Sequence, residues 1–118
     1  SPAFTDRKEN QNAISSIKKD VEKFSEIYDV IIIKGKEDIL ITYRVKQMQR
    51  FRMKKIEQRI KEELKKNYPK ERFTVSSDYK IFLEAARLQK KVKDDPQYTK
   101  ERAEKRFQEI LKLQKELT

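Results

Sequence analysis

The side chains of this sequence that could do chemistry are mainly cations, and they are concentrated in one segment. Between Arg44 and Lys70 the chain carries 11 lysines and arginines against three glutamates, so this segment holds +8 of the formal net charge of +10. Such an excess attracts polyanions, including nucleic acid, anionic lipid headgroups, teichoic acid and acidic protein surfaces. The chemistry that the sequence offers first is therefore anion binding.

Several of these cations recur at helical spacing. Arg52, Lys55 and Arg59 are three and four residues apart, and Lys66 follows seven residues later, so a helix would bring them near one another. Such a set can meet a row of phosphates. The alternative is that the same residues only keep the helix solvated. The predicted anion-binding residues are Arg50, Arg52, Lys55, Arg59 and Lys66.

Two apolar residues accompany these cations at the start of the same predicted helix. Met48 and Phe51 would either add apolar contacts to a bound partner or, in the case of Phe51, pack into the core. For Phe51 we favour packing into the core, where aromatic side chains usually lie.

Catalytic chemistry finds little support in the residue types. The chain has no His and no Cys, which removes the usual zinc ligands, thiol nucleophiles and imidazole bases. Glu62 and Glu63 are adjacent, and neighbouring helix positions diverge by about 100°, so the two carboxylates cannot converge on one atom. The single Gly cannot build a phosphate-binding loop. We predict a non-enzymatic domain without a metal or cofactor.

The apolar pattern predicts the elements that position these cations. Residues 13–24 read as a helix and residues 28–33 and 39–45 as two strands, joined by a hairpin turn at Gly35, which accepts positive φ without penalty. Partial alternation in the second strand predicts a hairpin with one buried face. The helical apolar positions are Ile14, Ile17, Val21 and Phe24.

The second half of the chain is mostly helical. Residues 48–67 predict a long helix that ends before Pro69, and residues 72–76 predict a short third strand. Two further helices follow, separated by the Asp-Asp-Pro break at residues 94–96. The residues available to cap or open these helices are Ser77, Asp78, Pro96 and Thr99.

The order of elements predicts an α+β fold. It consists of a three-stranded sheet with helices packed on one face, in the order helix, strand, strand, helix, strand, helix, followed by a C-terminal helix. We divide the chain into a flexible or tag-derived leader (residues 1–9), an α+β core domain (10–93) and a C-terminal amphipathic helix (94–118).

The C-terminal helix carries an apolar stripe that offers a second interaction surface. An amphipathic helix of this kind can bind a partner groove, self-associate or lie on a membrane, and the alternative is that it docks on the domain's own core. The predicted partner-binding face consists of Phe107, Ile110, Leu111 and Leu117.

The chain resembles sporulation lipoproteins of the YhcN/YlaJ type. In that family a helix precedes a hairpin with a Gly turn, a charged helix follows, and a strand then runs into a Val-Ser-x-Asp-like stretch that opens the next helix. The likeness covers roughly residues 10 to 93, and the parts that carry it are residues 28–35, residues 39–45, the Lys-rich helix, the motif Val75-Ser76-Ser77-Asp78, and Phe82 and Leu88.

The resemblance implies a protein of endospore-forming bacteria that is held on the outer face of a spore membrane by a lipidated cysteine and acts in germination or outgrowth. The same element order is similar to ring-building and BON-type domains, which bind lipid surfaces or other copies of themselves. This sequence contains no Cys, so either the anchor preceded Ser1 or the likeness is structural only.

Three functional hypotheses follow. The first is a spore-envelope domain that binds an anionic membrane surface, an envelope polymer or another envelope protein. The second is a nucleic-acid-binding or ribosome-associated module. We rank it below the first because Tyr28 and Tyr43 are the only aromatic residues of the predicted hairpin strands, and because a chain with one Gly cannot supply the GxxG loop of KH domains. The third is a self-assembling envelope scaffold that forms homo-oligomers.

Overall fold

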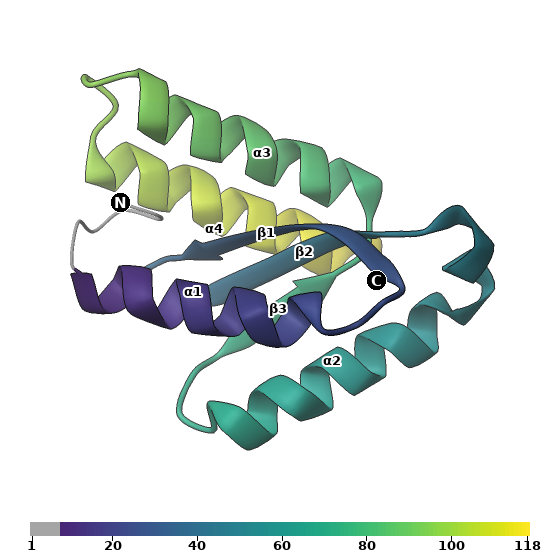
Figure 1. Ribbon diagram of the computed structural model, residues 1–118. Helices are drawn as coiled ribbons and strands as arrows, with labels where there is room; N and C mark the ends of the chain where they lie inside the picture. Colours follow the sequence, from purple (N-terminus) through teal and green to yellow (C-terminus); the bar gives the residue numbers. More distant parts are fainter. Residues whose placement is uncertain (1–7) are drawn as a thin grey trace.

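The computed structural model describes residues 8–118, which form helices around one three-stranded sheet (Figure 1). The predicted leader lies outside the described residues except for its last two positions, which already belong to the first helix. In chain order the elements are α1 (Lys8–Glu22), β1 (Ile27–Lys34), β2 (Ile39–Val45), the 3-10 helix η1 (Gln47–Arg52), α2 (Met53–Asn67), β3 (Phe73–Ser76), α3 (Tyr79–Asp94) and α4 (Lys100–Leu117).

The sheet has the order β1-β2-β3, with β2 at its centre. The hairpin pairs β1 and β2 in antiparallel register, from Lys34 opposite Ile39 to Ile27 opposite Val45. β3 pairs with β2 in parallel, which requires the crossover that η1 and α2 provide. The α+β class, the three strands and the predicted order of elements are confirmed.

Helices cover both faces of the sheet, which corrects the expectation of helices on one face (Figure 1). On one side, Ile41 and Tyr43 pack in a cluster with residues of α1 and α2. On the other, Ile33 and Leu40 pack in a second cluster with residues of α3 and α4. The reason lies in the hairpin, where the paired residues Ile33 and Leu40 put apolar side chains on the face opposite Ile41 and Tyr43, so neither face can be left to water.

The C-terminal helix docks on the domain instead of projecting from it. Phe107 and Ile110 are fully buried in the α3–α4 side of the core, and Leu111 is partly buried against the same cluster. Only Leu117 of the predicted partner-binding face stays exposed, at 48%. That prediction is therefore wrong for Phe107 and Ile110, because the apolar second face of the sheet gives their stripe an intramolecular partner.

Side-chain caps mark the N-terminal ends of α3 and α4. The Asp78 carboxylate accepts hydrogen bonds from the backbone N–H groups of Lys80 and Ile81 and caps α3. Thr99, the alternative cap, accepts a hydrogen bond from Arg102 N–H and caps α4, so Pro96 lies in the preceding turn and not, as predicted, in the first turn of the helix. The helix predicted over residues 48–67 begins as the 3-10 segment η1 and becomes α-helical only at Met53.

Gly35 is required by a close approach and not, as predicted, by positive φ. Its backbone φ lies outside the left-handed range, but a Cβ atom there would lie 2.5 Å from Cε2 and 2.6 Å from Cδ2 of Phe107. The hairpin turn therefore provides the space in which the ring of Phe107 packs. The same turn contacts α4 again where Lys36 N–H donates to Glu104 Oε1 at 3.1 Å.

This contact yields a stability prediction. We expect Gly35→Ala to lower the free energy of unfolding by about 1–3 kcal/mol, since the added methyl group overpacks against a buried ring. Chemical denaturation would measure the loss, with the exposed Lys36→Ala as a control that changes stability little. In the Phe107→Leu background the cost of Gly35→Ala should fall. An unchanged cost would contradict the steric explanation.

Candidate anion-binding surface

Two of the five predicted anion-binding residues are engaged by a buried carboxylate. Glu26, in the loop between α1 and β1, is 8% exposed, and its Oε2 lies 2.9 Å from Arg59 Nη1 and 4.0 Å from Arg52 Nη2. Its backbone carbonyl accepts a hydrogen bond from Lys46 N–H at 2.8 Å. Glu26 therefore joins the end of β2, η1 and α2, and its arginine partners have a structural role.

The electrostatics of Glu26 agree with this role. A hydrogen bond from its own main chain and the guanidinium of Arg59 hold the pKa of the carboxyl below its ordinary value near 4.5. Arg59 also lies over the ring of Phe24, with 5.0 Å between the guanidinium carbon and the ring centroid. Arg59 is thus held on two sides, and turning it toward a ligand would break both contacts.

The other three predicted residues do not form one site. Arg50, Lys55 and Lys66 are exposed, and none makes an ion pair within the part of the chain that the structure describes. Lys55 and Lys66 are 11 residues apart on α2, which is about 16 Å along a helix. Lys66 borders a shallow depression that also contains Glu62 and Glu63, so its surroundings are not purely cationic.

The 3-10 segment η1 presents apolar side chains to solvent. Met48 is 83% exposed and Phe51 is 84% exposed, and no residue of η1 is buried. Packing of Phe51 into the core is therefore contradicted. The 3-10 geometry explains the difference, because at three residues per turn Met48 and Phe51 lie on the same side, away from the apolar stripe of α2.

Exposed cations surround these two side chains. We call Met48 and Phe51, together with Lys46, Arg50, Lys54 and Lys55, the η1 tip; each of the four cations is exposed. Figure 1 shows η1 projecting at the end of the molecule where α2 begins. Large exposed apolar side chains rimmed by charge are typical of an interaction site.

A pocket that sequence reasoning missed lies beside the η1 tip. It has a volume of about 580 Å³, and Tyr28, Arg44 and Tyr79 are among the residues that line it. The alternation of β2 already placed Arg44 on the face opposite Tyr43. The presence of Tyr79 there depends on how α3 returns along the sheet, which no local pattern encodes.

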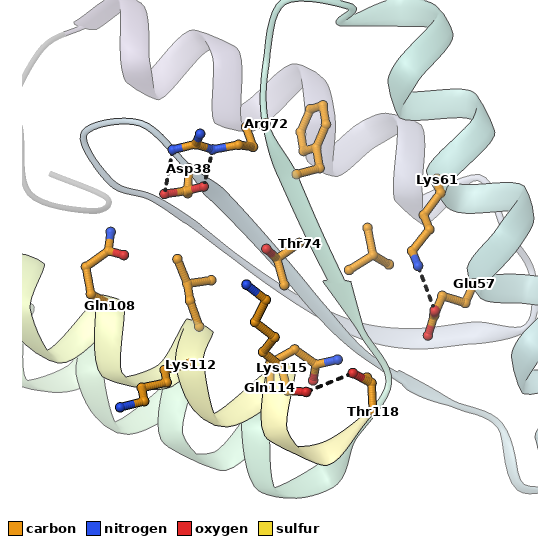
Figure 2. Close-up of a pocket in the computed structure, with 13 residues that line it drawn as sticks. Asp38, Glu57, Lys61, Arg72, Thr74, Gln108, Lys112, Gln114, Lys115 and Thr118 are labelled. Atoms are coloured by element: carbon orange, nitrogen blue, oxygen red, sulfur yellow. Dashed lines mark hydrogen bonds and ion pairs between the residues drawn. The ribbon is translucent and has the colours of Figure 1, made fainter.

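A second groove, of about 640 Å³, runs beside β3 between α2 and α4 (Figure 2). Its acidic residues are already paired: Arg72 Nε lies 2.7 Å from Asp38 Oδ1, and Lys61 Nζ lies 3.0 Å from Glu57 Oε2. Lys112 and Lys115 on α4 remain without an ion pair among the described residues. The groove is therefore more balanced in charge than the surface around η1.

Metal and membrane-spanning features are absent from residues 8–118. No group of three acidic side chains gathers there to hold a metal ion. None of the helices in this range combines the length and the apolar character needed to cross a bilayer.

In comparisons with known proteins, no family model, no curated protein and no solved structure matches the chain significantly. The resemblance to the YhcN/YlaJ-type family stays a prediction.

The Glu26 cluster gives a pH-dependent prediction. We expect Glu26→Gln to lower the free energy of unfolding at pH 7 by about 1–2 kcal/mol, because an amide binds the half-exposed arginines less strongly than a carboxylate does. Since the pKa of Glu26 is lowered by folding, its stabilisation is complete above the unfolded pKa and is lost as pH falls through the folded pKa.

Urea denaturation of both proteins between pH 7 and pH 3 would test this. The control is Glu57→Gln, which removes a surface pair with Lys61 and should change stability by less than about 0.5 kcal/mol. A difference between wild type and Glu26→Gln that stayed constant down to pH 3 would argue against an ionised Glu26 as the source of the stabilisation.

Proposed function

We propose that this chain is a non-enzymatic binding domain of a spore-envelope lipoprotein, which meets an anionic membrane surface through the η1 tip. The observation that carries the proposal is the exposure of Met48 and Phe51, at 83% and 84%, among four exposed cations. Apolar side chains of this kind enter the acyl boundary of a bilayer while the surrounding cations meet its headgroups.

The expected strength of this contact suits a protein that has a second anchor. Full burial of a Met or Phe side chain contributes about 1.5–3 kcal/mol, and each cation near an anionic surface contributes about 1 kcal/mol. Part of this sum is offset by the lost freedom of the bound protein. The tip alone therefore gives reversible binding, and stable attachment needs a second signal, as a lipidated cysteine would provide.

The membrane proposal accounts for more of the tip than nucleic-acid binding does. Phosphate contacts explain the cations equally well, but an exposed thioether such as Met48 contributes little to base stacking, which aromatic rings provide. Assignment to the spore envelope and to germination or outgrowth rests on the family resemblance, and a homo-oligomeric scaffold remains the alternative in which the tip meets another copy.

Vesicle co-sedimentation tests the proposal directly. We expect the chain to bind vesicles of phosphatidylcholine with phosphatidylglycerol at about 150 mM salt, and not vesicles of phosphatidylcholine alone. Met48→Ser with Phe51→Ser should weaken binding at least about tenfold, because the inserted apolar surface is lost. Arg50→Glu with Lys55→Glu should abolish it, since both cations are exposed and their loss leaves the Glu26 cluster intact.

The controls use residues of α4 that do not belong to the η1 tip. Lys112→Glu with Lys115→Glu makes the same change in net charge, and Leu117→Ser removes a half-exposed apolar side chain, so both should bind as wild type does. Equal losses in Arg50→Glu with Lys55→Glu and in Lys112→Glu with Lys115→Glu would mean that only the overall charge matters. A gel shift with mixed nucleic acid and no sedimentation with vesicles would replace the membrane proposal with the nucleic-acid alternative.

A further inference from the structure

The pocket beside the η1 tip is lined by cations and hydroxyl groups. It lies where the end of β2, the start of η1 and the start of α3 meet, and its volume is about 580 Å³. The lining residues that carry polar chemistry include Tyr28, Arg44, Lys46, Arg50, Ser77 and Tyr79. Among the residues that the structure describes, no carboxylate lines it.

Arg44 is held in place by aromatic rings. Its guanidinium carbon lies 4.8 Å from the ring centroid of Tyr79, 5.2 Å from that of Tyr28 and 5.9 Å from that of Phe82. Cation–π contacts of this kind restrain a guanidinium without taking up its N–H groups. Arg44 is therefore oriented in advance while its donors remain available.

The cations of the pocket have no carboxylate partner among the described residues. Arg44, Lys46 and Arg50 make no ion pair in the range 8–118. Asp29 is opposite Arg44 in the β1–β2 ladder, yet the two form no ion pair within 4 Å. The Asp78 carboxylate, at the start of α3, accepts hydrogen bonds from two backbone N–H groups of that helix.

We propose that this pocket binds the phosphate of an anionic phospholipid headgroup, with Arg44 as the central ligand. A guanidinium donates two parallel hydrogen bonds to phosphate oxygens, and two flanking ammonium or guanidinium groups balance the remaining charge. The hydroxyl groups of Ser77, Tyr28 and Tyr79 supply further donors. The volume exceeds that of a phosphate alone and leaves room for the attached alcohol.

The position of the pocket favours a lipid as the source of the phosphate. Lys46 and Arg50 line the pocket and also belong to the η1 tip, so a headgroup bound at Arg44 would lie next to the segment that carries Met48 and Phe51. This inference rests on the proposed membrane function, but its chemistry predicts that a soluble phosphate ester binds as well.

The first experiment is a titration with sn-glycerol 3-phosphate, followed through the ¹⁵N resonance of Arg44 Nε. We expect this resonance to shift with glycerol phosphate and to shift far less with acetate at the same ionic strength. Arg44→Lys keeps the charge but loses the forked donor geometry, and should weaken binding about tenfold. Its matched control is Arg102→Lys, which should have no effect on binding. Arg102 also lies over an aromatic ring, with 4.9 Å between its guanidinium carbon and the ring centroid of Tyr98.

A second pair of variants tests the pocket without changing the half-buried Arg44, whose substitution could disturb the fold. Lys46→Gln with Arg50→Gln changes only exposed residues and should also weaken glycerol phosphate binding, whereas Lys112→Gln with Lys115→Gln should not. On vesicles of equal surface charge, wild type should prefer phosphatidylglycerol to oleate as the anionic component, and Arg44→Lys should lose that preference.

The outcomes separate the two proposals. If Arg44→Lys binds both glycerol phosphate and phosphatidylglycerol vesicles as Arg102→Lys does, the pocket proposal is overturned while the tip can still bind membranes. If glycerol phosphate binds in an Arg44-dependent manner but no vesicle does, the pocket holds for a soluble phosphate ester and the membrane function fails. Tighter binding of a single-stranded oligonucleotide than of vesicles, with the same Arg44 shift, would overturn the lipid assignment.

Discussion

The central strand β2 is the constraint on which the rest of the molecule depends. It is paired on both edges and buried on both faces, with Ile41 and Tyr43 on one side and Leu40 on the other, all of them 0% exposed. A strand of this kind requires two layers of helices, and the chain supplies α1 and α2 for one face and α3 and α4 for the other. The docking of α4, and the need for a glycine where Phe107 meets the hairpin, both follow from this requirement.

The candidate binding surface follows from how the chain leaves β2. After Val45 the chain must cross to a parallel strand, and it begins the crossover with a 3-10 segment in which no residue is buried. Glu26 fixes the base of this segment through Lys46 N–H, Arg52 and Arg59. The restraint lies at the base, so Met48 and Phe51 beyond it remain exposed without loss of core packing.

Sequence reasoning found the elements and their order because periodicity and capping are local: β2 matches its predicted bounds, and Asp78 and Thr99 cap the predicted helices. It failed where the result depends on tertiary neighbours. Alternation along residues 39–45 places Leu40 on the opposite face of the strand from Ile41, but nothing local indicates that a second layer of helices covers that face. Phe51 was expected in the core on the basis of residue type, and its exposure follows from the 3-10 turn.

The same distinction explains why the predicted row of cations is not one binding site. Helical spacing places Arg52, Lys55 and Arg59 near each other, but it says nothing of the buried carboxylate that engages two of them. Charge counted along a sequence therefore overstates the charge available to a ligand, because a buried carboxylate forms ion pairs with the arginines nearest to it. The cations that remain available to a ligand are those without a carboxylate partner. Within residues 8–118, Arg44, Lys46 and Arg50 have no such partner and line one pocket without a carboxylate, so they are better candidates for anion binding than Arg52 and Arg59.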